Sequence, residues 1–281
     1  MSDEYRPSGF NVLPTVIKNL LIINGLFFLA TLVFELKLHI DLTNILGLHY
    51  FFSEEFRPYQ LVTYMFMHGS FGHIFFNMFA LWMFGNILEN VWGPKRFLIY
   101  YLVCGIGAIL LHYTIHYFEI QPTITALNNY IADPSGDAFK YLFDKGTLDF
   151  SGIRDKNTFQ DLLNNYQSLL ASGETGKALH ASVIFVEEYK RVFLNAPVVV
   201  GASGSVFGLL LAFGMMFPDS KIYMYFLFPI KAKYFVILYG AIELFGAVNN
   251  SQTDNIAHYA HLGGMLFGFF LIKYWKKKRS F

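Results

Sequence analysis

Apolar residues in this chain fall into six long stretches separated by segments rich in polar residues. They lie at residues 16–36, 73–92, 97–117, 197–217, 234–248 and 255–273. An α-helix needs about 20 apolar residues to cross a bilayer, because each residue advances it by roughly 1.5 Å. The pattern therefore predicts an all-α polytopic membrane protein, a bundle of six transmembrane helices whose fifth helix is short. The first stretch follows Ser2-Asp3-Glu4 rather than a basic segment, so we expect a retained helix and not a cleaved signal peptide.

The segment at 119–196 interrupts this pattern between the third and fourth apolar stretches. It holds ten acidic residues, half of the 20 in the chain. Apolar residues recur at helical spacing over 159–170 and 177–194, which predicts two helices. Turn-forming residues occur at 128–129, 133–136 and 172–174. We interpret 119–196 as a partly helical extracytoplasmic insertion.

The composition agrees with a membrane location. Of 281 residues, 54% are hydrophobic and 15% are charged, and the mean hydropathy is +0.40. A typical soluble domain carries roughly 25% charged residues, and a disordered chain is far less apolar than this one. The single cysteine, Cys104, excludes a disulfide scaffold, and the net charge of +1 offers nothing for nucleic acid to bind.

The distribution of Lys and Arg predicts the orientation, because basic residues gather on the cytoplasmic side of a membrane protein. The tail contains Lys276-Lys277-Lys278-Arg279, whereas the outer loop at 37–72 holds only Lys37 and Arg57. Both termini are therefore expected in the cytoplasm. The predicted domains are a cytoplasmic segment at 1–15, three spans with the first outer loop at 16–118, the insertion at 119–196, three spans at 197–274 and a basic tail at 275–281.

Polar side chains near the start of three predicted spans indicate a functional site, because such groups are costly at membrane depth. His73 and Asn77 open the second span on one helical face, Ser203 lies in the fourth and His261 lies in the sixth. All three spans run inward from the outer side. Ser203 and His261 each follow the predicted helix start by six residues, so each lies roughly 9 Å deep. A hydroxyl and an imidazole at matched depth can form a nucleophile–base pair.

Glycines predict that the fourth and sixth helices touch. Gly204 and Gly208 lie on one face of the fourth helix, and Gly264 and Gly268 lie on one face of the sixth. Small residues at this spacing let transmembrane backbones approach closely. Each feature taken alone also fits ordinary helix packing or an interhelical hydrogen bond; it is their combination on one side of the membrane that favours catalysis.

A serine nucleophile also needs donors for the oxyanion that forms on attack. His73, Asn77 and backbone N–H groups near Ser203 could supply them. Asp254 lies seven residues before His261, roughly 10 Å along a helix, which is too far for a hydrogen bond. We therefore expect a Ser–His dyad. We expect Glu243 in the fifth span to form an interhelical hydrogen bond, and His258 to be solvated near the outer surface.

These residues resemble the motifs of rhomboid intramembrane serine proteases. The matching segments are His68-Gly-Ser-Phe-Gly-His73-Ile-Phe-Phe-Asn77, Gly85-x3-Glu89-x3-Gly93, Gly201-Ala-Ser203-Gly204 and Ala260-His261-x2-Gly264-x3-Gly268. The resemblance covers the six-helix core of about 200 residues.

The resemblance implies a Ser203–His261 dyad with an acyl-enzyme, an oxyanion site at His73 and Asn77, and cleavage within or beside transmembrane segments of other membrane proteins. It also implies that His68 supports the first loop, and that no metal or cofactor is needed. Phe207 replaces a tyrosine that often stacks on the histidine in this family. The insertion at 119–196 is longer than the usual connection, and we expect it to contact a substrate or partner.

Two other functions compete with proteolysis. One is a catalytically silent relative that binds and escorts membrane proteins, although such relatives typically lack the serine or the histidine. The other is a proton-coupled transporter that uses His73, His261 and Glu243, although transporter sites usually lie at the midplane between repeated halves. The six-helix core favours a bacterial inner membrane as the location, with lipid and transmembrane substrates as partners. The sequence indicates no particular oligomeric state.

Overall fold

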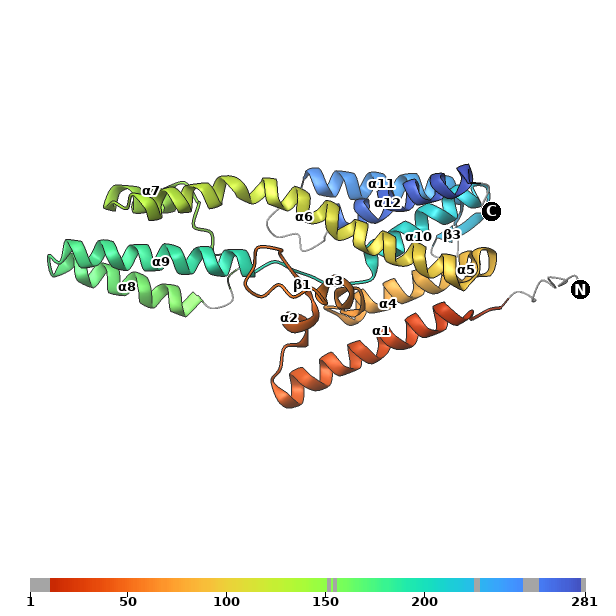
Figure 1. The fold of residues 1–281 in the computed structure, drawn as a ribbon, viewed down its shortest axis with the longest axis horizontal. Helices are drawn as coiled ribbons and strands as arrows, with labels where there is room; N and C mark the ends of the chain where they lie inside the picture. The colour runs from red at the N-terminus through yellow and green to blue at the C-terminus, as the bar shows by residue number, and fades with distance from the viewer. Residues whose placement is uncertain (1–10, 151–152, 154–155, 225–227, 250–257, 279–281) are drawn as a thin grey trace, which may run out of the picture. The chain divides into compact units, whose positions relative to one another are not determined.

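The structure, a computed structural model, is mostly helical and divides into two compact units (Figure 1). It describes all residues except 1–10, 151–152, 154–155, 225–227, 250–257 and 279–281. Unit 1 comprises residues 1–48, 58–113 and 199–281, and unit 2 comprises residues 49–57 and 114–198.

Three helical stretches in the described part of the chain are long and apolar enough to cross a membrane. The first joins α1 (Thr15–Val33) to a π-helical turn η1 (Phe34–Leu38); the second joins α4 (Phe71–Ala80), η3 (Leu81–Gly85) and α5 (Asn86–Trp92); the third is α6 (Pro94–Ala132). The first two agree closely with the predicted spans. The third continues well past the predicted end at residue 117.

The remaining apolar helices are α10 (Ser203–Met216), α11 (Ala232–Val248) and α12 (His258–Lys277). The prediction that the fourth helix begins at residue 197 is wrong, because the residues before Ser203 are not helical. The predicted start of the sixth at residue 255 lies outside the described residues. Between α10 and α11, the strands β3 (Lys221–Met224) and β4 (Phe228–Lys231) pair antiparallel, with Lys221 opposite Lys231. We did not predict this hairpin.

Short elements connect these helices. They are α2 (Leu42–Leu46), β1 (Leu48–His49), α3 (Gln60–Thr63), the 3-10 turn η2 (Tyr64–Phe66) and β2 (Val198–Val199).

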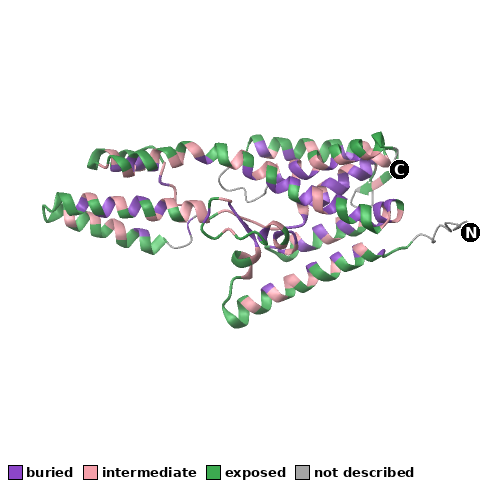
Figure 2. Cartoon of the chain, in the orientation of Figure 1, coloured by how far each residue is buried: buried purple, intermediate pink, exposed green. Residues whose placement is uncertain are grey.

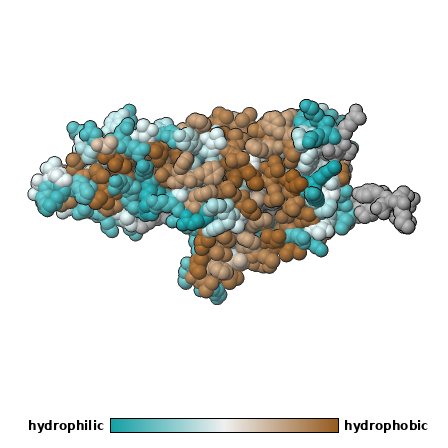
Figure 3. All heavy atoms as spheres, viewed as in Figure 1, coloured by the Kyte–Doolittle hydropathy of each residue, from teal (hydrophilic) through white to brown (hydrophobic). Residues whose placement is uncertain are grey.

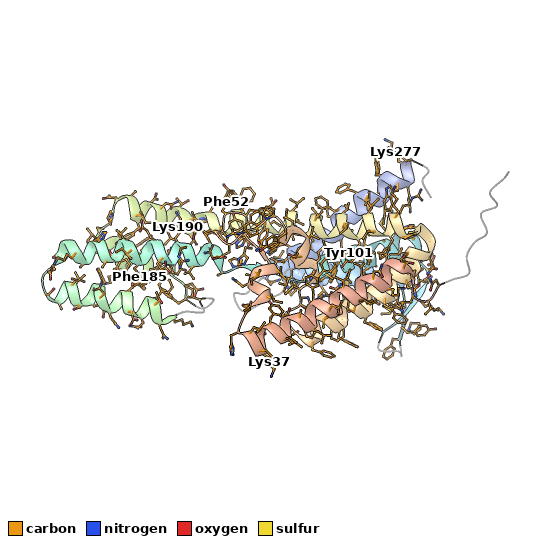
Figure 4. All side chains as sticks on the ribbon, turned by 60° about the horizontal axis from the view of Figure 1, so that its bottom comes forward. Lys37, Phe52, Tyr101, Phe185, Lys190 and Lys277 are labelled. Atoms are coloured by element: carbon orange, nitrogen blue, oxygen red, sulfur yellow. The ribbon has the colours of Figure 1, made fainter. Side chains whose placement is uncertain are left out.

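Helix α10 forms the buried centre of unit 1, as Figure 2 shows by the run of buried residues along it. Gly204 and Gly208 of this helix are packed against both α6 and α12. A methyl group placed on Gly208 would overlap the side chain of Cys104 and lie 3.1 Å from the carbonyl oxygen of Gly264. Tyr100 donates a hydrogen bond of 2.9 Å to the Gly208 carbonyl, and Ser205 donates one of 2.7 Å to the carbonyl of Tyr101, which Figure 4 labels.

Much of the surface of unit 1 is apolar (Figure 3). On α1, the side chains of Leu26 and Leu29 are 60% and 59% exposed, and hydrophobic residues cover the surface over this helix in Figure 3. An exposed apolar surface of this extent is unfavourable in water and favourable against lipid chains. Together with the three apolar stretches, it identifies an integral membrane protein.

Unit 2 has its own aromatic core. It contains the end of α6, α7 (Gly136–Asp144), α8 (Lys156–Ala171) and α9 (Thr175–Asn195). Phe185 on α9, labelled in Figure 4, makes ring contacts with Phe139, Phe143, Phe150 and Phe159 at centroid distances of 5.5, 5.9, 6.0 and 5.5 Å. Such ring pairs stabilise a small core beyond their burial alone.

Both helices predicted within 119–196 are present, as α8 and α9, and the turns at 133–136 and 172–174 separate the helices of unit 2. The turn predicted at 128–129 is wrong, because both asparagines lie inside α6. Their neighbours Leu127 and Tyr130 are buried in the aromatic core of unit 2. The burial of these side chains favours continuation of the helix, despite the turn propensity of two consecutive asparagines.

Candidate active site

Ser203 is the first residue of α10, placed there by a sharp turn. Gly201 has a φ of 120°, which only glycine adopts without strain, and its N–H donates a hydrogen bond of 2.9 Å to the carbonyl of Tyr64. The hydroxyl of Tyr64 in turn donates to the carbonyl of Gly105 at 2.8 Å. The premise that Ser203 lies six residues inside its helix is therefore wrong, and its depth in the membrane stays a prediction.

Ser203 and His261 lie within hydrogen-bonding distance, with 2.8 Å between Ser203 Oγ and His261 Nε2. Close packing of α10 on α12 makes this possible. A methyl group on Gly264 would overlap the backbone of Gly204, so the two helices touch through main-chain atoms. Gly268 differs from the prediction, because a methyl group there would meet Tyr100 and Cys104 of α6 rather than α10.

The imidazole of His261 is held on its flat side by Phe207. Their ring centroids are 4.2 Å apart, and the ring planes differ by 11°. Phe207 lies one turn after Ser203 on α10, so the helix that carries the hydroxyl also carries the ring that orients the imidazole.

Glu243 on α11 binds the other nitrogen of His261. Its Oε2 lies 2.8 Å from His261 Nδ1 and 2.7 Å from His258 Nδ1. An ionised carboxylate can only accept hydrogen bonds, so each Nδ1 carries a proton. In a neutral His261 this leaves Nε2 as an acceptor for the Ser203 hydroxyl.

Our expectation of a solvated His258 is wrong, since this residue is only 8% exposed. Sequence reasoning treated Glu243 as a hydrogen-bonding residue between helices without a stated partner. The sequence did indicate that Glu243 has a partner, because a carboxylate in an apolar stretch is energetically costly unless it is paired. Asp254, which we considered and rejected as a third member, lies outside the described residues.

His73 and Asn77 on α4 lie beside Gly201. A methyl group placed on Gly201 would lie 2.7 Å from His73 Nε2 and 3.7 Å from Asn77 Nδ2. Ser70 caps α4 by accepting a hydrogen bond of 3.1 Å from the His73 N–H, which places both side chains in the first turns of the helix. Asn77 Nδ2 is buried and has no hydrogen-bond partner among the described residues.

The ring of His68 contacts the ring of His73, with 5.0 Å between the ring centroids. Its side chain is 2% exposed, and burial, together with the nearby His73, lowers the pKa of His68 to about 4. His68 is therefore neutral at physiological pH.

Glu243, His258 and His261 each offer one donor atom, and the three atoms lie within 4.8 Å of one another. Carboxylate and imidazole groups can bind Zn²⁺. The separations of 2.7 and 2.8 Å are, however, those of hydrogen bonds, and a metal ion would have to replace both Nδ1 protons. Hydrogen bonding accounts for this cluster.

Comparison with known proteins supplies a family context for this geometry. The Rhomboid domain profile matches residues 55–122 and 164–278, which leaves α7 and its flanking segments outside the match. The chain is also 24% identical over 232 residues to an uncharacterized mitochondrial rhomboid protein of the fission yeast Schizosaccharomyces pombe. That alignment covers 80% of this chain and 53% of the relative, so the chain spans about half the length of the protein that it matches.

Proposed function

Because this chain belongs to the rhomboid family, we propose that it is an intramembrane serine endopeptidase that cleaves transmembrane segments of other membrane proteins. The observation that carries the proposal is the 2.8 Å contact between Ser203 Oγ and His261 Nε2, with Nδ1 of the same imidazole held by Glu243. In this state the histidine can accept the serine proton as the serine attacks.

The reaction uses His261 first as a base and then as an acid. Ser203 Oγ attacks the scissile carbonyl carbon while its proton moves to His261 Nε2. The tetrahedral intermediate then collapses: the C–N bond breaks, and the leaving amine takes the proton from Nε2. Water, activated by the same nitrogen, hydrolyses the acyl-enzyme and restores Ser203.

Three groups are positioned to stabilise the oxyanion. Asn77 brings a buried amide donor without a partner among the described residues, and His73 Nε2 lies beside Gly201. The N–H of Ser203 belongs to the first turn of α10, where backbone donors have no partner inside the helix. Donors held in place before the charge develops stabilise the transition state most effectively. His68, Gly201, Gly204, Phe207, Gly264 and Gly268 support this arrangement.

We propose that six helical stretches cross the membrane: α1, the continuous α4–η3–α5 stretch, α6, α10, α11 and α12. Both termini then lie on one side, which the basic tail assigns to the cytoplasm. Unit 2 would then be extracytoplasmic and free to contact substrates or partners. The bacterial inner membrane stays a prediction.

The test uses a transmembrane reporter with purified enzyme in lipid vesicles. Ser203→Ala and His261→Ala should each abolish cleavage while the protein still inserts and elutes as a folded species. A fluorophosphonate should label the wild-type chain at Ser203 and label neither variant. If Ser203→Ala still cleaved the reporter, the protease assignment would be wrong. If the wild-type protein bound the reporter and released it uncleaved, it would be a catalytically silent escort protein instead.

A further inference from the structure

We propose that Glu243 is a positioning residue for His261, so that the site operates as a Ser–His–Glu triad rather than the dyad expected from the sequence. This inference rests on the proposed protease function. Its basis is a chain of two hydrogen bonds, from Ser203 Oγ to His261 Nε2 at 2.8 Å and from His261 Nδ1 to Glu243 Oε2 at 2.8 Å. The imidazole is therefore held at both nitrogens.

The surroundings of Glu243 make this contact strong. The side chains of Glu243 and His261 are only 9% and 12% exposed, so water competes weakly for the hydrogen bond. Hydrogen bonds to an ionised group are about twice as strong as neutral ones, and low local polarity strengthens them further. A carboxylate in an apolar helix carries a large desolvation cost, which two imidazole donors offset here.

His258 holds the same carboxylate from a second direction. Its Nδ1 lies 2.7 Å from Glu243 Oε2, and its ring occupies a slot that Gly246 leaves open one turn along α11. A methyl group on Gly246 would lie 2.5 Å from two atoms of the His258 ring. Tyr259 also donates a hydrogen bond of 3.0 Å to the carbonyl of Ala247, which joins α12 to α11 at this level. His258 thus positions Glu243, and Glu243 positions His261.

The chemical consequence concerns the proton on His261. With Nδ1–H donated to the carboxylate, the tautomer that could not accept the serine proton is excluded. When that proton reaches Nε2, the imidazolium charge faces the ionised Glu243, which stabilises it. Glu243 itself takes up no proton. Every transfer in the reaction still occurs at Nε2.

The central experiment is Glu243→Gln, which keeps the shape of the side chain and removes its charge. We expect kcat for reporter cleavage and the rate of Ser203 labelling by a fluorophosphonate to fall by about 100-fold or more. We expect KM to change by less than about 3-fold, because Glu243 touches no substrate. Glu243→Asp should recover part of kcat. A purely structural role would change the amount of folded protein and would not separate kcat from KM.

Glu89 provides the matched control, since it is a second buried carboxylate among the described residues of the apolar helices. It is 3% exposed and accepts hydrogen bonds of 2.9 and 2.8 Å from the N–H groups of Val16 and Ile17. Glu89→Gln should lower the melting temperature and leave kcat of the folded fraction unchanged.

A double-mutant cycle tests the role of His258. His258→Phe keeps a ring in the slot beside Gly246 and removes the donor. We expect kcat to fall by about 3- to 10-fold in the wild-type background and not to fall further in Glu243→Gln, because contacting residues in one network are not additive. Equal effects in both backgrounds would show that His258 does not act through Glu243.

The outcomes separate this inference from the proposed function. If Glu243→Gln cleaves at the wild-type rate while Ser203→Ala is inactive, the site is a dyad and the positioning role of Glu243 is wrong. If Ser203→Ala also cleaves, the protease assignment itself fails.

Discussion

The ring of Phe207 lies almost parallel to the imidazole of His261, with an angle of 11° and 4.2 Å between centroids. Glu243 and Ser203 hold the two nitrogens of that imidazole in its own plane, whereas Phe207 restrains it from tilting out of the plane. Stacking on His261 therefore needs no hydroxyl on the ring at position 207.

Phe207→Ala should lower kcat by about 10-fold, because an aromatic contact contributes roughly 0.5–1.5 kcal/mol and its loss lets the imidazole tilt. Phe207→Tyr should stay within about 3-fold of wild type, since the ring is retained. Reporter cleavage at saturating substrate measures both. Wild-type kcat in Phe207→Ala would show that the hydrogen bonds alone orient His261.

Gly201→Ala should inactivate the protein. Its φ of 120° is strained for any residue with a Cβ, and the added methyl group would lie 2.7 Å from His73 Nε2. The control is Gly72→Ala on α4, where nothing lies within 4 Å of an added methyl group. Cleavage and fluorophosphonate labelling should be lost in the first variant and retained in the second.

Asn77→Ala tests the oxyanion donors. Removing a donor of this kind lowers kcat by about 10² to 10³-fold, with a smaller effect on KM. Asn24→Ala on α1 is the control, because Asn24 is also a buried amide but donates to the carbonyl of Leu20 at 2.7 Å. That variant should lose stability and keep kcat. Equal kcat values for the two variants would remove Asn77 from the oxyanion site.

Some parts of this structure could be predicted from the sequence, because each depends on a residue pattern within a single segment of the chain. Apolar stretches of bilayer length identified α1 and the stretch that ends at Trp92, and helical spacing identified α8 and α9. The glycines of α10 and α12 predicted a helix contact through main-chain atoms. To predict that Ser203 pairs with His261, one also had to know that α10 and α12 face each other. The resemblance of the motifs and their order to the rhomboid family indicated this.

Other parts depend on contacts between segments far apart in the chain. The start of α10 follows from the conformation of Gly201 and its hydrogen bond to Tyr64, and neither can be deduced from an apolar run. The contact between Glu243 and His261 depends on how α11 is rotated against α12. A carboxylate within an apolar stretch indicates that a partner exists, but the residue identities do not specify which one.

Gly264→Ala tests the close approach of α10 and α12. The methyl group would overlap the backbone of Gly204, which cannot move as a flexible side chain would. Overpacking of this kind costs about 1–3 kcal/mol, so we expect a lower melting temperature in detergent together with a loss of cleavage. Gly25→Ala on α1 is the control, because the space around that glycine is open. A stable, active Gly264→Ala protein would contradict the contact.

His68 predicts a dependence of stability on pH. Because the pKa of His68 in the folded protein is lowered to about 4, below its ordinary value of 6.5, the unfolded chain binds a proton in that interval that the folded chain does not. The free energy of unfolding should therefore fall by about 3 kcal/mol as the pH drops from 6.5 to 4. Below that range the contribution of His68 to stability should stay constant.

The measurement is the free energy of unfolding in detergent micelles between about pH 7.5 and pH 4. This range spans the ordinary pKa of His68, 6.5, and its pKa of about 4 in the folded protein. His68→Asn removes the titrating group, so its stability should decline less steeply than that of the wild type, even if it begins lower. His180→Asn on α9 changes an exposed histidine and should keep the wild-type slope. Parallel curves for wild type and His68→Asn would mean that His68 can be protonated without unfolding, and hence that the buried ring has a proton acceptor nearby.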